Sequence, residues 1–406
     1  MFFGNEKLFQ LALNLQEPWF VKGIEFNKDA GELHIYIDFR RGASFPCPVC
    51  GEPAKTHDTE KETWRHLNFF QYKAFIHSRT PRTKCPLHGV RLVNVPWSRP
   101  GSDFTLLFEA LVLAMAAQMP VSAIAAIVDE HDTRLWRIVR HYVKEARAKE
   151  DFSKVEEVGV DETACGRGQN YISLFYDLHA QRVLFATLGR EAFAVTCFAE
   201  DLVGHGGKPE EIKTMVCDMS QAYLRGIREK FTRALVVLDK FHLMKLMNEA
   251  LDEVRRLEQK EVKELKNTRY IWLKNPSNLT AKQKSIFEDL SRLNLKTARA
   301  YRMKLALQEI YRSPDRATAE EGLRRLYWWL VHSRLEPMKE LGRTIKAHWK
   351  EILNYFEARR TNGVLEAVNG LVQAARLKAR GYRNVDNLIT MVYLIAGKLR
   401  FETCMG

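Results

Sequence analysis

Apolar and polar residues alternate along the first hundred residues in the manner of β-strands. Val21–Phe26 and Leu33–Phe39 lie on either side of the turn Asn27–Gly31, so the pattern predicts a β-hairpin. A second alternating stretch, Thr63–Arg79, predicts further strands. Residues 1–99 are therefore expected to form a β-rich domain.

The apolar spacing becomes helical in residues 100–150. Phe104–Gln118 predicts a helix that Pro120 ends, while Ser122 and Thr133 are expected to cap a short helix and a longer one. This arrangement resembles a DNA-binding helix-turn-helix, and a plain three-helix linker is the alternative. In the first interpretation, the basic side chains of the longer helix contact DNA: Arg134, Arg137 and Arg140.

Residues 151–258 alternate between short apolar strands and helices. The predicted order is three strands, a helix, a strand, a helix and a strand, formed by Val158–Asp161, Asn170–Tyr176, Arg182–Thr187, Glu191–Leu202, Lys213–Cys217, Gln221–Phe231 and Ala234–Leu238. This is the order of a ribonuclease H-like mixed sheet, with antiparallel strands first and parallel strands after. Residues 258–406 predict further helices, which are highly charged at first. The expected fold class is multidomain α+β.

Composition narrows the partners. The chain has 63 Lys and Arg against 50 Asp and Glu, a net charge of +13 that favours nucleic acid or an anionic membrane. The membrane is disfavoured because no uncharged apolar run approaches the ~20 residues of a spanning helix. The start of the chain, 1–20, lacks the pattern of a secretion signal. The seven cysteines are an odd number and four of them are scattered, which favours a reduced cytoplasmic protein.

Four residues of the first domain have the spacing of a zinc site. Cys47 and Cys50 form one short knuckle, Cys85 and His88 form another, and a glycine closes each. The two-residue gap lets both ligands of a knuckle reach one tetrahedral ion. One structural Zn²⁺ is therefore expected; ordinary buried thiols and a surface histidine are the alternative. Nearby basic residues, Arg65 among them, fit either DNA contact or a solvated face.

Carboxylates at strand ends predict a second metal site. Asp161 and Asp218 end strands that neighbour each other in the expected sheet, where two carboxylates repel unless a cation lies between them. Such oxygen ligands suit Mg²⁺ or Mn²⁺, and two ions are expected for phosphodiester chemistry. The best third ligand is Glu366, on a helix that has Val368 and Leu371 on its apolar stripe. Asn369 and Gln373 share the polar face of Glu366.

Other acidic residues compete for this role. Asp239 also ends a strand and either binds metal or caps the next helix, and His242 belongs to the same short motif. Alternation along the strand directs Glu162 to the opposite face of the sheet. Glu366 is the single acid in a basic segment, whose predicted DNA contacts are Arg376, Lys378 and Arg380.

These features resemble bacterial insertion-sequence transposases of the ISL-three type, in the DDE class. Besides the zinc knuckles and the helix-turn-helix, the resemblance rests on Trp64-Arg65-His66-Leu67, Gly159-Val160-Asp161-Glu162, Cys217-Asp218-Met219-Ser220-Gln221-Ala222-Tyr223, Leu238-Asp239-Lys240-Phe241-His242, Thr361–Asn369 and Gly381-Tyr382-Arg383-Asn384. The separation of 148 residues between Asp218 and Glu366 (366 − 218) agrees with a helical insertion before the final glutamate. The resemblance implies that this insertion covers 259–355 and that 356–406 return to the catalytic domain as its C-terminal helices.

The resemblance implies a DNA-cutting and DNA-joining enzyme. Asp161, Asp218 and Glu366 would hold the metal ions, and the zinc and helix-turn-helix domains would bind terminal inverted repeats in double-stranded DNA. A homodimer is expected because two element ends must be paired, and the expected location is the bacterial cytoplasm, with nucleoid association when the protein is bound to DNA. A structure-specific ribonuclease H-like nuclease and a non-catalytic DNA-binding descendant of a transposase are the alternatives.

Overall fold

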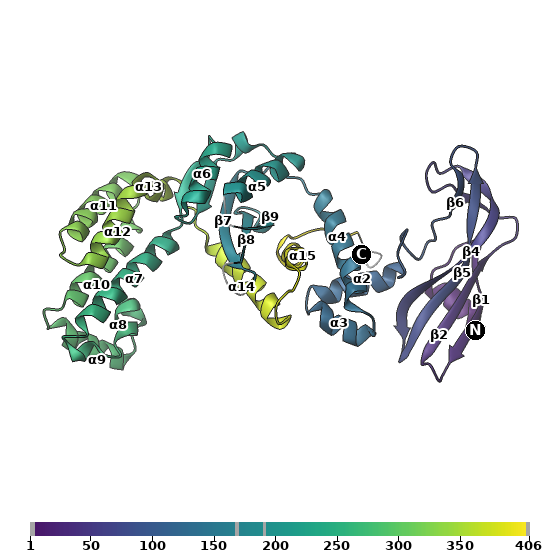
Figure 1. The fold of residues 1–406 in the computed structure, drawn as a ribbon, viewed down its shortest axis with the longest axis horizontal. Helices are drawn as coiled ribbons and strands as arrows, with labels where there is room; N and C mark the ends of the chain where they lie inside the picture. Colours follow the sequence, from purple (N-terminus) through teal and green to yellow (C-terminus); the bar gives the residue numbers. More distant parts are fainter. Residues whose placement is uncertain (1–4, 167–169, 190–191, 403–406) are drawn as a thin grey trace. The chain divides into compact units, whose positions relative to one another are not determined.

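The computed structural model describes residues 5–166, 170–189 and 192–402, and this part of the chain divides into two compact units (Figure 1). The first unit extends to Arg147 and includes 400–402, and the second covers Ala148–Leu399. Within the described residues, every helix is too short or too polar to cross a membrane.

A mixed sheet with the strand order β1-β2-β5-β4-β3 forms the centre of the first unit, and β6 pairs with β5. Its elements are α1 Asn5–Ala12, β1 Trp19–Asn27, β2 Glu32–Phe39, β3 Ser44–Pro46, β4 Pro53–Phe69, β5 Tyr72–Cys85 and β6 Gly89–Leu92. The predicted hairpin is confirmed, since β1 and β2 pair antiparallel. The predicted strands of the second alternating stretch are β4 and β5, a long antiparallel hairpin.

One face of this sheet buries the apolar half of each alternating strand. Trp97 packs edge-on against Trp19 and Trp64, with ring centroids 5.0 and 5.5 Å apart. Leu33 and Ile76 of the adjacent parallel strands β2 and β5 are fully buried beside them. The period-2 pattern thus produces a one-sided core, as expected for strands that expose their other face.

Helices α2 Leu106–Ala116, α3 Val121–Val128 and α4 Asp132–Ala148 follow the sheet and confirm the predicted helical segment. Their caps differ from the prediction. Thr105 caps α2, and Pro120 precedes α3, so Ser122 lies inside that helix. Thr133 lies inside α4, where its backbone N–H donates to His131 Nδ1 at 3.3 Å. The first backbone N–H groups of a helix have no partner within it, so proline, which lacks an N–H, is tolerated at the start of α3. Because Pro120 occupies the capping position, Ser122 does not cap the helix.

Arg65 joins the sheet of the first unit to these helices. It is 2% exposed, and its guanidinium donates to the carbonyl oxygens of Ala74 (3.2 Å) and Val128 (3.4 Å). Its Nε lies 3.6 Å from Glu130 Oε1, and its backbone N–H donates to Asp103 O at 2.8 Å. Both interpretations of Arg65, DNA contact and a solvated face, are therefore wrong. Its guanidinium is buried and interacts with groups inside the unit.

The second unit contains a sheet with the strand order β11-β10-β7-β8-β9. Its strands and covering helices are β7 Glu157–Ala164, β8 Tyr171–Asp177, β9 Arg182–Leu188, α5 Ala192–Gly204, β10 Thr214–Cys217, α6 Gln221–Lys230 and β11 Leu235–Leu238. Strands β7, β8 and β9 pair antiparallel, whereas β10 and β11 run parallel to β7. This confirms the ribonuclease H-like arrangement; Glu191, the expected start of α5, lies outside the described residues.

A helical segment separates β11 from the last helices of the second unit. It comprises α7 Lys240–Glu258, α8 Arg269–Leu273, α9 Ala281–Ser291, α10 Lys296–Ile310, α11 Arg316–Val331, α12 Glu336–Ala347 and α13 Trp349–Ala358, with 3-10 turns at Pro209–Glu211 before β10 and at Lys263–Leu265 and Pro276–Asn278 within it. Trp272, Phe287 and Tyr301 pack edge-on in its interior. The chain then returns to the sheet as α14 Gly363–Lys378 and α15 Val385–Ala396.

Candidate active site and zinc centre

The zinc-type residues of the first unit come together as predicted. The donor atoms of Cys47, Cys50, Cys85 and His88 all lie within 4.8 Å of one another. Cys50 Sγ is 3.7 Å from Cys85 Sγ, and His88 Nδ1 is 3.8 Å from Cys47 Sγ and 3.6 Å from Cys85 Sγ. A tetrahedron with metal–sulfur bonds of about 2.3 Å has edges of about 3.8 Å, so the donor set fits a structural zinc ion.

Local backbone geometry supports the two knuckles. Gly51 and Gly89 adopt positive φ values of 75° and 70°, which a side chain would disfavour. Backbone N–H groups of Cys50 and Val49 point at the sulfur of Cys47 and lower the pKa of that thiol to about 6. The site therefore favours the thiolate form that binds metal.

Strand register in the second unit aligns three aspartates in a row. The parallel pairs Val216–Gly159 and Cys217–Leu238 link β10 to its two neighbours. Continuing both registers by one or two residues sets Asp218 opposite Asp161 on one side and opposite Asp239 on the other. The three carboxylates lie near enough to one another that the charges of Asp218 and Asp239 both act on Asp161.

Asp161 differs from the prediction in one respect. It was expected to end its strand, but β7 continues to Ala164 because β8 pairs with it over that length. Pairing with β10, in contrast, stops at Gly159. The strand therefore separates from β10 just before Asp161, and this opens the place where the carboxylates meet.

The surroundings of Asp161 disfavour its negative charge. Burial raises the pKa of its carboxyl to about 6, and the charges of Asp218 and Asp239 act in the same direction. Hydrogen bonds oppose the shift: Oδ1 accepts the backbone N–H of Glu162 and Oδ2 accepts Asn369 Nδ2, both at 2.8 Å. A cation among these carboxylates would relieve their repulsion, and oxygen donors of this kind suit Mg²⁺ or Mn²⁺.

Glu366 approaches this row on α14. Gly159 permits the close contact, because a Cβ there would lie 2.7 Å from Leu365 Cδ1 and 2.8 Å from Asn362 Oδ1. Asn362 donates to Val160 O at 3.1 Å and, through its backbone, to Asp239 Oδ1 at 3.4 Å. The Glu366 charge in turn contributes to the raised pKa of Asp239, after burial as the main cause.

Further along α14, polar side chains fasten the helix to β7. Gln373 donates to Thr163 Oγ1 at 2.6 Å and to Ala164 O at 3.0 Å. Arg376, predicted as a DNA contact, donates to the same carbonyl at 3.0 Å, so it also has a structural contact. The polar face was visible in the sequence, but the roles of Asn369 and Gln373 required the strand opposite them.

The buried stripe of α14 includes Val368, as predicted, but not Leu371. Leu365, Val368 and Val372 are buried, whereas Leu371 is 53% exposed. Residues at i, i+3 and i+7 face one side of a helix, and the contact with Gly159 selects the stripe that contains Leu365.

The competing acids occupy separate positions. Asp239 caps α7 by accepting the backbone N–H of Phe241 at 3.4 Å while it also lies in the carboxylate row. His242 lies at the start of that helix, where its positive charge, when present, favours the Asp239 carboxylate. Glu162 interacts instead with Tyr223 of α6, whose pKa is raised mainly by burial and also by that carboxylate. Alternation along β7 is thereby confirmed.

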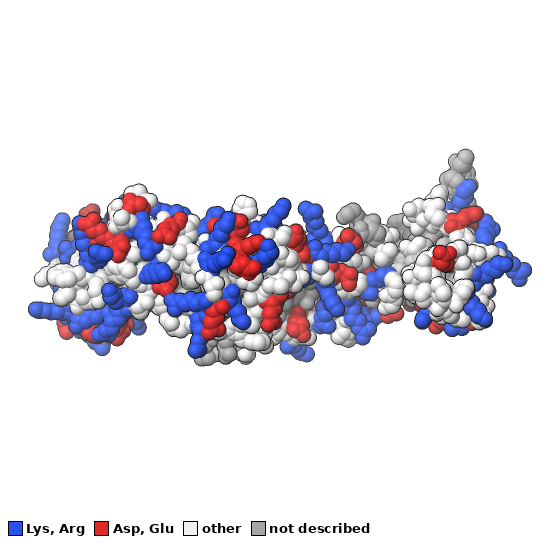
Figure 2. All heavy atoms as spheres, turned by 90° about the horizontal axis from the view of Figure 1, so that it is seen from above, with Lys and Arg blue, Asp and Glu red and all other residues white. Residues whose placement is uncertain are grey.

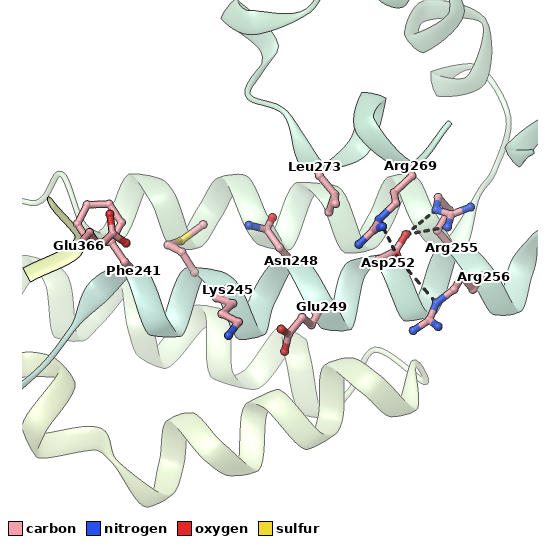
Figure 3. A pocket seen from close by; sticks show the side chains of 11 residues that line it. Phe241, Lys245, Asn248, Glu249, Asp252, Arg255, Arg256, Arg269, Leu273 and Glu366 are labelled. Atoms are coloured by element: carbon pink, nitrogen blue, oxygen red, sulfur yellow. Dashed lines mark hydrogen bonds and ion pairs between the residues drawn. The ribbon is translucent and has the colours of Figure 1, made fainter. Parts of the chain in front are cut away.

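Glu366 lies at one end of a pocket of about 620 Å³ that follows α7 (Figure 3). Phe241 lies beside it, and Asn248 lines the middle. Asp252 forms the far end together with three arginines. Most of the lining is one face of α7, but the sequence did not indicate the pocket because Arg269, Leu273 and Glu366 close it from other helices.

The predicted DNA-contact residues differ in their surroundings. Arg134 lies within hydrogen-bond distance of Glu130 and stacks over Phe104, with 4.5 Å between its Cζ and the ring centroid. The other predicted contacts, apart from Arg376, are exposed: Arg137, Arg140, Lys378 and Arg380. Acidic and basic side chains are interspersed over the visible face in Figure 2, so charge alone does not trace a path for DNA.

Comparisons with known proteins match the chain along its length. The profile described as "Transposase" in the ISL3 family matches residues 158–392, its helix-turn-helix domain matches 93–143, and the zinc finger of transposases IS204/IS1001/IS1096/IS1165 matches 43–88. The transposase for IS1557 of Mycobacterium tuberculosis is 24% identical, covering 96% of this chain and 95% of its own. The transposase for IS1001 of Bordetella parapertussis is also 24% identical, and the match covers 90% of this chain and 92% of that protein.

Proposed function

Because the chain belongs to the ISL3 family of insertion-sequence transposases, and is a DNA-binding transposase, we propose that it cuts and rejoins DNA with Asp161, Asp218 and Glu366 as its catalytic triad. The observation that carries this proposal is the grouping of the carboxylates: continuing the strand register sets Asp218 opposite Asp161 and Asp239, and the charge of Glu366 on α14 acts on Asp239. A non-catalytic descendant would have no need to keep this costly arrangement.

The donor set supports divalent metal at this site. Asp161 and Asp218 offer carboxylate oxygens side by side, and burial of Asp161 keeps its charge poorly solvated. Bound Mg²⁺ would polarise the scissile phosphate and lower the pKa of an attacking hydroxyl. Asn369 holds one oxygen of Asp161 by its hydrogen bond and leaves the acid fixed in orientation. Asp239 adds negative charge to the same row and anchors the start of α7.

DNA recognition is proposed for the first unit. Its helix-turn-helix and zinc-bearing sheet would bind the terminal inverted repeats of the element, with Arg137 and Arg140 on the exposed face of α4. A homodimer is proposed for the complex that pairs two ends. The cytoplasm of a bacterium, where such DNA lies, is the proposed location.

Strand cleavage in vitro tests the triad. The purified protein is incubated with Mg²⁺ and a DNA fragment that carries one end of the insertion sequence, taken from beside its gene. Asp161→Asn, Asp218→Asn and Glu366→Gln are each expected to lower cleavage by at least about a thousandfold, since each loses a charge that would hold metal. Binding of the same fragment should remain.

Glu162→Gln is the matched control, because Glu162 follows Asp161 directly but faces α6. It should retain cleavage. Full activity in any of the three triad variants would remove that residue from the triad.

A further inference from the structure

The pocket beside Glu366 separates its charges along its length. Its acidic end holds Glu366, and its far end holds Arg255, Arg256 and Arg269 around the single carboxylate of Asp252 (Figure 3). Between the two ends, the opposite charges of Lys245 and Glu249 offset each other. One negative charge thus faces three positive charges, so the far end keeps an excess of two. This excess is part of the helical insertion and lies outside the triad.

The three arginines differ in how tightly the protein holds their side chains. Arg255 is 6% exposed and is fixed by Asp252 Oδ1, 2.8 Å from its Nε, and by Gln259 Oε1, 2.6 Å from its Nη1. Arg256 and Arg269 lie 3.7 and 3.4 Å from Asp252 Oδ2, with side chains 64% and 55% exposed. Arg255 therefore neutralises Asp252, while the other two guanidiniums remain available to solvent or a ligand.

Other groups in and beside the pocket suit a nucleic acid. Tyr270 is 63% exposed, and the Arg269 guanidinium carbon lies 5.8 Å from its ring centroid. Asn248, halfway along, has a buried Oδ1 that accepts no hydrogen bond from the residues described in the structure. Guanidiniums pair bidentately with phosphate oxygens, so the exposed arginines beside this pocket suit a DNA backbone.

We propose that this pocket holds the sugar–phosphate backbone of the DNA strand leading away from the bond cut at Glu366, with Arg256 and Arg269 as its phosphate contacts. The proposal rests on the proposed function of the triad. From Phe241 to Arg256, α7 rises ~22 Å, at 1.5 Å per residue. At 3.4 Å per base pair, this distance corresponds to about six or seven base pairs from the cut.

Salt dependence of DNA binding tests the proposal independently of cutting. The full-length protein and its Arg256→Ala/Arg269→Ala variant are titrated with the end-carrying fragment between about 50 and 200 mM KCl. Losing two phosphate contacts should reduce the slope of log K against log salt by about 1.8. Arg256→Lys/Arg269→Lys, which keeps the charges, should restore most of the slope.

Arg324→Ala/Arg325→Ala is the matched control, since both residues are exposed on α11 of the same insertion and pair with Glu320 and Glu321. It should leave the slope unchanged. An unchanged slope in the Arg256/Arg269 alanine variant would overturn the proposal, and a change in its oligomeric state instead would assign the pocket to a protein partner. Wild-type protein that never cuts, yet shows the expected slopes, would refute the triad and keep the pocket.

Discussion

Gly159 shows how a single missing side chain determines the position of a helix that carries a proposed catalytic group. It lies two residues before Asp161 in β7, and Leu365 and Asn362 of the returning chain occupy the space where its Cβ would be. Any larger residue would have to displace the start of α14, which carries Glu366. The residue that positions the glutamate is therefore 207 positions before it (366 − 159).

Gly159→Ala is expected to destabilise the second unit by about 1–3 kcal/mol through overpacking. Cleavage should fall further than stability accounts for, because α14 would move away from the aspartates while DNA binding by the first unit stays intact. Denaturant unfolding and cleavage rates on the folded protein measure the two effects. Gly370→Ala is the control: Gly370 lies on α14 itself, and a Cβ there would meet nothing within 4 Å. Equal losses in both variants would contradict this role for Gly159.

At the residue scale, the residues that could bind metal were easier to predict from the sequence than the surroundings of individual side chains. The zinc ligands follow from spacing alone, since both knuckles are local. The burial of Arg65 does not, because Val128 O and Glu130 Oε1 come from a segment more than sixty residues away.

Among the elements, the β4–β5 hairpin links the sheet of the first unit to its helices through adjacent residues. His66 follows Arg65 and lies within hydrogen-bond distance of Thr105, with 2.9 Å between His66 Nδ1 and Thr105 Oγ1. Burial, reinforced by the Arg65 charge, lowers the pKa of His66 to about 4. The folded unit therefore contains this histidine in its neutral form.

This histidine predicts an acid-sensitive first unit. Between pH 6.5, near the unfolded pKa of histidine, and pH 4, the unfolded chain binds a proton that the folded chain does not, so stability falls as pH falls. The loss is at most about 3 kcal/mol, and His66→Gln should remove most of it. Amide exchange in β4 and β5, corrected for the intrinsic effect of pH, measures the difference. Identical pH profiles for both proteins would contradict the prediction.

Element types were predictable because their periods are local, whereas their ends depended on partners. The strand containing Asp161 extends to Ala164 since β8 pairs there, and α3 begins after Pro120 without using Ser122. Likewise, Leu371 is exposed because the contact at Gly159 rotates the neighbouring stripe inward. The order of strands and helices along the chain could be predicted without knowing which strands pair, and the observed sheet is the one that this order implies.

For the whole molecule, the division into two units separates the zinc cluster from the carboxylate row. We propose that recognition and cutting are likewise separate, with boundaries near residues 99, 150, 258 and 355. Cys47, Cys50, Cys85 and His88 all belong to the first unit, and the three aspartates and Glu366 to the second.

A fragment of residues 1–150 is therefore expected to contain about one zinc ion and to protect the element end in a footprint, but to cut nothing. Elemental analysis and footprinting check the two properties. Cys85→Ser in the same fragment should lose zinc and the folded knuckles. A native fragment without zinc would overturn the metal assignment.

The position of the helical insertion has a consequence in time. Glu366 is synthesised 148 residues after Asp218 (366 − 218). At about 5–20 residues per second, a ribosome needs roughly 7–30 s to cover that distance. During this interval the nascent chain has the DNA-reading unit and two of its proposed metal ligands but not the third. A chain still being translated next to its own gene would therefore be able to hold DNA before it is able to break it.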